Sequence, residues 1–250
     1  MRRPLYLFLT VYLACLCVSQ NAQAQIASID SSSQQNALNN AVGLYNAAIG
    51  NQAPIYTGAE YYFYDPHIKG NAYFLENNGF TPGNIYYDRA LYKNVSMLYD
   101  LNLDQVVVLL PKHISKFSLV KERVKNFDYL GHHFININTD TLSPNTPLKS
   151  GFYDQLYNGK TQILVKRSKS IQTSAGGSTI ETFFTSSKDY YIKKDNVYYS
   201  IGSSQGSILN ILKDKKKELR QYIRANDIAY RDNPEEAMVK IATYYDHLTN

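Results

Sequence analysis

One short motif in the chain has the form expected of a catalytic nucleophile. Gly202-Ser203-Ser204-Gln205-Gly206 matches G-x-S-x-G, follows a predicted strand, precedes a predicted helix and has His247 downstream. In an enzyme, this motif holds a serine hydroxyl on a strained turn within reach of a histidine. Such a turn needs parallel strands joined by helical crossovers, whereas the strand before Gly202 belongs to a predicted antiparallel hairpin. A serine hydrolase using Ser204 and His247 is therefore the alternative, and the preferred interpretation is a turn that caps a helix at Ser204 or Ser207.

The histidines do not form a metal-ligand pattern. They are His67, His113, His132, His133 and His247. Neighbouring side chains in a strand point to opposite faces, so His132 and His133 cannot bind one metal ion as a pair. The glycine pair Gly176-Gly177 lies in a serine-rich turn between two predicted strands, which is not a phosphate-binding arrangement. We expect no metal and no cofactor.

The N-terminus has the pattern of a secretory signal peptide over residues 1–24. Two arginines precede an apolar run, residues 5–18, and Ala22-Gln23-Ala24 is a small-x-small cleavage site. The run is shorter than the roughly 20 residues that span a bilayer. Cleavage after Ala24 predicts an exported chain, periplasmic or extracellular, with no transmembrane span. A lipid anchor at Cys15 is the alternative.

Removing this leader changes the cysteine content and the charge. Both cysteines, Cys15 and Cys17, precede Ala24, so the mature chain has no disulfide, no thiolate nucleophile and no cysteine-bound zinc. The whole chain has a net charge of +5, and Arg2 and Arg3 account for two of these charges. So small a net positive charge does not indicate nucleic-acid binding.

Tyrosine is in clear excess, with 23 residues against no tryptophan. In the hairpin predicted over 189–201, an even loop places Tyr191, Tyr198 and Ser200 on one face. The opposite face, which we assign to the core, has Tyr190, Ile192, Val197, Tyr199 and Ile201. Outward tyrosines on a rigid sheet are good contact residues for sugars or peptides, although tyrosine also simply suits a half-buried strand. Tyr191 and Tyr198 are therefore candidate binding residues for an envelope protein or a glycan.

The elements that must position these residues form one predicted α+β domain, residues 25–250. Apolar residues at helical spacing predict an N-terminal helix over about 33–49, laid on a sheet. Apolar runs separated by turn residues predict strands over about 56–201, with a meander in 79–111. Helical spacing returns in two to three C-terminal helices over about 207–248. We expect a curved antiparallel β-meander sheet, either open or partly closed, flanked by these helices.

Further strands are predicted in the middle of the chain. A long strand is predicted over 160–171, with a basic end at Lys166, Arg167 and Lys169. A turn at 174–178 leads to another strand, 179–186. Residues 152–157 are either one helical turn or an extended piece, and 56–75 contain two short strands.

Three segments carry a resemblance to a group of known proteins. They are GNIYYDRALYKNVSMLYDLNLDQVVVL, GFYDQLYNGKTQILVKRSK and KKKELRQYIRAN. These segments resemble a family of secreted or periplasmic β-rich proteins of Bacteroidota whose function is unknown. The resemblance implies export and a β-rich fold, and it brings no catalytic motif. The expected function is that of an exported, non-catalytic binding or envelope-associated module.

Overall fold

The computed structural model describes residues 31–112, 114–176, 179–202 and 204–249. By their contacts, the residues of the chain form two compact units, 1–41 and 42–250. The first unit is described only as the beginning of helix α2 (Ser31–Ile49). The predicted leader with Cys15, and also His113, Gly177 and Ser203, lie outside the described residues.

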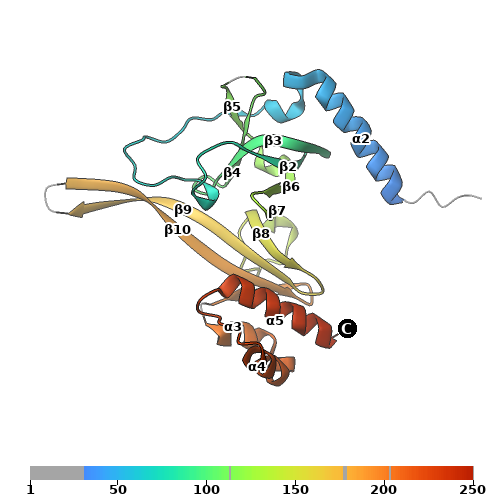
Figure 1. The fold of residues 1–250 in the computed structure, drawn as a ribbon, viewed down its shortest axis with the longest axis vertical. Helices are drawn as coiled ribbons and strands as arrows, with labels where there is room; N and C mark the ends of the chain where they lie inside the picture. The colour runs from blue at the N-terminus through green and yellow to red at the C-terminus, as the bar shows by residue number, and fades with distance from the viewer. Residues whose placement is uncertain (1–30, 113, 177–178, 203, 250) are drawn as a thin grey trace, which may run out of the picture. The chain divides into compact units, whose positions relative to one another are not determined.

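An open antiparallel sheet of eleven strands dominates the second unit (Figure 1). Its order is β1-β5-β4-β3-β2-β6-β7-β8-β9-β10-β11, so most strands lie beside their neighbours in the sequence. The bounds are β1 Ala59–Glu60, β2 Thr81–Tyr87, β3 Ala90–Asp100, β4 Gln105–Leu109, β5 Lys116–Ser118, β6 Val124–Tyr129, β7 His132–Ile137, β8 Gly151–Asn158, β9 Gln162–Gly176, β10 Thr179–Lys194 and β11 Val197–Ile201. The predicted α+β class and antiparallel meander are confirmed, and the sheet is not closed.

Apolar residues cover both faces of this sheet. Along β3, Met97 and Tyr99 join the main core, where Tyr99 packs against Phe127 and other aromatic rings. The residue between them, Leu98, points to the opposite face and joins a cluster with Val107. This alternation follows from the two-residue period of a strand. Both faces are therefore structural along this part of the sheet.

The C-terminal helices are also confirmed. They are α3 (Gln205–Ile211), α4 (Lys216–Ala225) and α5 (Pro234–Thr249). The first turn of α5 has proline at its first position, and Asn233 Oδ1 accepts a 3.2 Å hydrogen bond from the Glu236 N–H. The apolar side of α5 buries Met238 and Ile241 in a second core with Ile192 of β10.

Two local predictions differ from the structure around the long strand. β10 is one continuous strand of 16 residues, where the sequence predicted separate strands over 179–186 and in the hairpin. Its length follows from β9, which reaches Gly176 and pairs with β10 from Thr179 to Lys193. Residues 152–157, left as either helical or extended, belong to strand β8.

Two further differences lie near the N-terminus. Residues 56–75 contain the two-residue strand β1 and short 3-10 turns in place of two full strands. The backbone turns at Leu75 and Glu76, which have φ of 51° and 56°. In the second half of α2, Val42 and Ile49 pack against the main core, but Leu44 and Tyr45 are exposed, so this part of the helix does not lie flat on the sheet.

No helix among the described residues is both long enough and apolar enough to cross a membrane.

Candidate functional site

The G-x-S-x-G segment forms the start of a helix. Ser204 is the N-cap residue of α3, with φ −101° and ψ 146°, the extended backbone usual at that position. The second expected cap, Ser207, lies inside α3, and its Oγ accepts a 2.7 Å hydrogen bond from the Gly202 N–H before the helix. His247 lies in the last turn of α5 with its ring stacked on Tyr244. No hydrogen bond among the described residues joins Ser204 to a histidine, so these groups do not form a nucleophile and base.

The β10–β11 hairpin pairs its faces as predicted, and each face is buried in part. Ile192 and Ile201 of the face assigned to the core lie in the second core. Its loop is Asp195-Asn196, and the positive φ of both residues fits a two-residue hairpin turn. Tyr191 is only 9 % exposed and packs edge-on against the Tyr153 ring at 5.8 Å. Ile137 and Leu148 belong to the same buried cluster. The expectation that Tyr191 faces solvent is therefore wrong, because distant segments cover that face.

The other tyrosines of the hairpin complete this correction. Tyr198 is half-buried, with Lys193 Nζ 5.6 Å from the centre of its ring. Tyr199, assigned to the core from its parity, is 40 % exposed. The hairpin thus offers no outward tyrosine platform at Tyr191 and Tyr198.

The described histidines pair with single carboxylates or with an aromatic ring. His132 Nδ1 lies 2.8 Å from Asp154 Oδ2, and His133 Nδ1 lies 2.6 Å from Asp128 Oδ1. Across the described ranges, no group of three or more His, Cys, Asp or Glu side chains is placed to hold a metal ion.

The basic end predicted on the long strand has a structural role. Lys166, Arg167 and Lys169 of β9 are all largely buried, and each reaches a different carboxylate partner. Buried charges are rare unless they are paired, so these pairs mark the points where β9 is fixed to the rest of the fold. We call them the ionic clamp.

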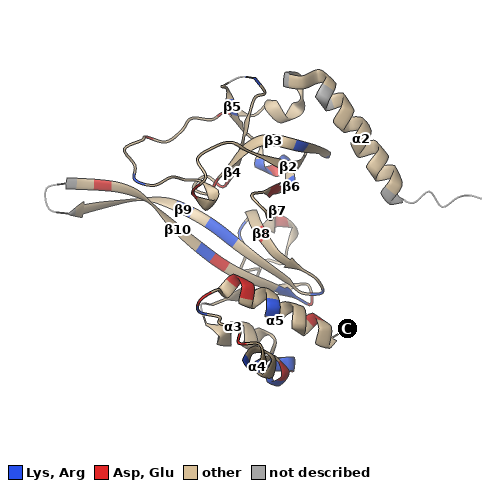
Figure 2. Cartoon of the chain, viewed as in Figure 1, with Lys and Arg blue, Asp and Glu red and all other residues tan. Residues whose placement is uncertain are grey.

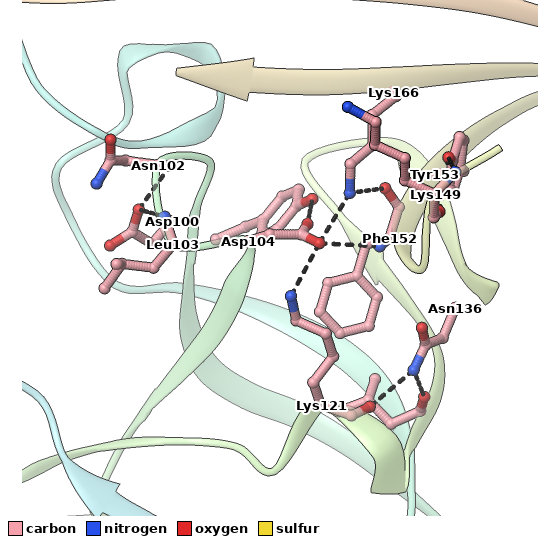
Figure 3. A network of polar contacts seen from close by, with 12 residues as sticks. Asp100, Asn102, Leu103, Asp104, Lys121, Asn136, Lys149, Phe152, Tyr153 and Lys166 are labelled. Atoms are coloured by element: carbon pink, nitrogen blue, oxygen red, sulfur yellow. Dashed lines mark hydrogen bonds and ion pairs between the residues drawn. The ribbon is translucent and has the colours of Figure 1, made fainter. Parts of the chain in front are cut away.

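The first pair of the clamp lies at the turn after β3 (Figure 3). Asp104 Oδ2 is 2.8 Å from Lys166 Nζ and 3.0 Å from Lys121 Nζ, and the Tyr99 hydroxyl donates to Asp104 Oδ1 at 2.7 Å. Burial alone would raise the pKa of Asp104, but the two ammonium groups outweigh it and hold the pKa below its usual range. Burial lowers the pKa of Lys166, and Asp104 offsets part of that change.

A glycine makes room for this pair. Gly151 has φ +141°, and a Cβ there would fall 2.2 Å from Asp104 Oδ2 and 2.6 Å from Lys166 Nζ. A residue with a side chain would displace the pair and would also be strained in this conformation. Gly151 is thus part of the clamp.

The second pair joins β9 to helix α5. Arg167 donates two hydrogen bonds to the Glu235 carboxylate, at 3.0 and 2.7 Å, and its Nε donates to Asp154 Oδ2 at 2.8 Å. Lys188 Nζ also contacts Glu235 at 2.8 Å. Burial alone would raise the pKa of Glu235, but the hydrogen bonds from Arg167 and Lys188 lower it to about 2.

The third pair fixes β9 to the loop before β2. Lys169 Nζ contacts the Glu76 carboxylate and donates to the Asn71 carbonyl oxygen at 2.8 Å. All three cations are therefore paired with carboxylates within the fold. Their arrangement supports rigid positioning of β9, with no free base or nucleophile among them.

Beyond the clamp, β9 and β10 continue as a two-stranded arm (Figure 1). The arm comprises residues 170–176 and 179–187, and Glu181 is its one charged residue (Figure 2). β8 pairs with β9 only as far as Val165. Ile180 is 77 % exposed and Ile171 is 38 % exposed. The arm thus presents uncharged surface to solvent.

The main chain of the arm has one occupied edge and one free edge. The Lys169 N–H points away from β10, since it donates to the Leu101 carbonyl oxygen at 3.2 Å. Alternate residues of an antiparallel strand share this direction, so the N–H and C=O groups of Ile171 and Thr173 also point outward. Among the described residues, no backbone hydrogen bond satisfies these groups of Ile171 and Thr173.

The opposite edge of the arm supports the same alternation. The Lys69 N–H donates to the Thr182 carbonyl oxygen at 2.9 Å, and the Phe184 N–H donates to the Lys69 carbonyl oxygen at 3.0 Å. Thr182 pairs with Thr173 across the arm, so both members of that pair turn their backbone groups outward. Lys69 therefore covers part of the β10 edge, whereas the β9 edge of the arm is open in the described part of the chain.

The sequence contained a signal for this arm that its interpretation missed. Residues 170–175 and 180–187 are rich in Ser, Thr and β-branched residues with a single charge, on both sides of Gly176-Gly177. Treating 179–186 and 189–201 as separate strands hid their common length. The fold and this site define an open-sheet α+β protein with a clamped, projecting β-arm. Comparison with protein-family models, with curated proteins and with solved structures found no match.

Proposed function

We propose that the chain is an exported, non-catalytic binding module that takes an extended segment of a partner protein onto the free edge of its arm. The observation that carries this proposal is the outward main chain of Ile171 and Thr173, which has no backbone hydrogen-bond partner in the described part of the chain. Addition of a strand to such an edge satisfies main-chain donors and acceptors directly and is a common mode of peptide recognition.

The chemistry of the arm selects the partner segment. Natural sheets protect exposed edges with charged residues, proline or bulges, and residues 170–175 contain neither charge nor proline. Their side chains are mostly short, so main-chain hydrogen bonds provide the affinity. The partner segment is accordingly extended and uncharged, because a charged residue placed there would lose water and gain no ion pair.

The ionic clamp supports this role. It fixes the base of the arm to three separate parts of the fold through Lys166, Arg167 and Lys169. An edge that is already rigid loses less conformational entropy when a strand is added. The clamp therefore contributes to affinity although it does not contact the partner.

Export is proposed from the leader, and the mass of the mature protein tests it separately. Cleavage after Ala24 gives a chain that begins at Gln25 and has no thiol. A mass that retains Cys15 with added acyl chains would replace a released module with a lipid-anchored one.

Cross-linking in the native envelope tests the binding edge. A photoreactive amino acid at the exposed position 180 reports a neighbour of the arm. The Thr173→Pro substitution removes an outward N–H and leaves the hydrogen bonds of the arm itself in place, because that N–H does not face β10. Thr173→Val is the matched control, because it keeps the N–H.

The proposal expects a cross-linked adduct in the unsubstituted and Thr173→Val backgrounds and its loss with Thr173→Pro. An adduct equally strong in all three backgrounds would show that the main-chain edge is not used. An adduct with twice the mass of the mature chain would identify the occupant as a second copy of this protein and overturn the assignment to a different partner.

A further inference from the structure

Helix α4 carries several positive charges on its exposed face. Residues 213–225 contain six Lys or Arg and two acidic residues, in a chain whose net charge is +5 (Figure 2). Lys217, Arg220 and Arg224 recur every three or four residues and so share one face of the helix. Leu219 and Ile223 are on the opposite face and are buried in the second core.

Four of these cations face solvent. Lys213, Lys217, Arg220 and Arg224 are exposed, and within the described part of the chain none of them forms an ion pair or a side-chain hydrogen bond. The nearby carboxylate of Asp214 is already held by Lys194 at 2.6 Å and by the Tyr245 hydroxyl at 2.9 Å. Like charges at this spacing repel one another along a helix, and a bound anion would relieve that repulsion.

The surface is hollowed beside the same residues. A concave region of about 880 Å³, open to solvent, has Lys213, Lys217, Arg220, Gln221 and Arg224 in its lining. The lining also contains two carboxylates, Asp214 and Glu218. From Lys217 to Arg224 the helix rises about 10 Å, so the cations can meet several successive negative groups.

We propose that this hollow, which we call the α4 groove, binds a linear anionic polysaccharide. The positive charge selects a polyanion, and Gln221 offers an amide to sugar hydroxyl groups. The proposal does not depend on the arm, because the α4 groove and the arm share no residue.

Two other polyanions fit the α4 groove less well. An anionic bilayer binds amphipathic helices through their apolar faces, but Leu219 and Ile223 are buried in the core and cannot insert. Single-stranded nucleic acid is held by aromatic rings that stack on its bases, and the lining contains no aromatic residue. A flexible charged glycan needs neither feature.

Direct binding measurements with defined polymers test the proposal. The probes are polygalacturonate, which carries carboxylates, and dextran sulfate, which carries sulfates, with neutral dextran as the uncharged reference. The variant is Arg220→Glu with Arg224→Glu in the full mature chain. The control is Lys93→Glu with Lys112→Glu, which makes the same change in net charge at exposed positions of β3 and of the turn after β4. Thermal unfolding of both variants checks that they fold.

The expected result is binding of at least one charged polymer, weakened at least tenfold in the α4 variant and by less than twofold in the control. Affinity should also fall as salt is added. Equal losses in the two variants, or binding of neutral dextran, would overturn the proposal. Tighter binding to phosphatidylglycerol vesicles or to an oligothymidine would also overturn it and would assign the groove to a membrane surface or a nucleic acid.

Discussion

Arg167 and Glu235 lie 68 residues apart in the sequence and meet as a two-hydrogen-bond ion pair that fastens β9 to the first turn of α5. The pair forms the point where the base of the arm, the sheet and the C-terminal helices are joined. Because Arg167 is buried and also contacts Asp154, loss of either carboxylate leaves a poorly compensated buried charge.

This pair predicts a specific dependence of stability on pH. The pKa of Glu235 is about 2 in the folded chain against 4.5 for the free group, so its ionised form stabilises the fold above pH 4.5. That contribution is lost as the pH falls from 4.5 toward 2. Glu235→Gln should lower the free energy of unfolding at pH 7, and the difference from the unsubstituted protein should shrink below pH 4.5.

Guanidinium denaturation between pH 7 and pH 2 measures both curves. Glu236→Gln is the matched control, since Glu236 is exposed and pairs with Lys240 on the helix surface, and it should change stability little. A Glu235→Gln difference that stays constant with pH would mean that this carboxylate is not held ionised by Arg167.

Replacing Gly151 by alanine should lower the stability of the fold both through close atomic contacts and through backbone conformation. Gly151→Ala places a methyl group against Asp104 and Lys166, whereas Gly131→Ala meets no atom within 4 Å although Gly131 has φ +81°. We expect Gly131→Ala to cost about 1–2 kcal/mol from conformation alone. Gly151→Ala should cost at least about 3 kcal/mol, because it also separates a buried ion pair. Equal costs from chemical denaturation would mean that the pair adjusts freely.

Ser204 should be chemically unreactive. Ser204 is the N-cap residue of α3 and hydrogen-bonds to no histidine that the structure describes, and an isolated serine hydroxyl is a weak nucleophile. We expect no labelling of the purified protein by a fluorophosphonate probe. Stoichiometric labelling that disappears in Ser204→Ala would support the serine hydrolase alternative.

Local signals in the sequence predicted the elements that depend on near neighbours. An even loop was predicted for the hairpin, and Asp195-Asn196 forms it as a two-residue turn. The C-terminal helices were predicted over about 207–248, and Asn233 with Pro234 begins the last of them, α5. These features arise from the conformational preferences of a few consecutive residues. Their prediction does not require knowledge of the tertiary fold.

Contacts between distant residues were not predictable in the same way. The alternation of side chains along the strand placed Tyr191 on the face that we expected to be exposed. Tyr191 is buried because Ile137 and Leu148, from elsewhere in the chain, pack on that face. The basic end of β9 was visible, but the position of its carboxylates was not, since Lys166 and Asp104 are 62 residues apart. Which residues of a hairpin share a face can be inferred from the local sequence. Which segments bury that face, and which carboxylates pair with a buried cation, depend on the topology of the fold.

The central claim is that the outer edge of β9 is open in the free protein, and residue-resolved hydrogen exchange tests it most directly. The amides of Gln172 and Ser174 face β10 and should exchange slowly, whereas those of Ile171 and Thr173 should exchange fast in the purified protein. Addition of the partner identified by cross-linking at position 180 should slow Ile171 and Thr173 selectively. Uniformly slow exchange at all four amides of the free protein would contradict an open edge.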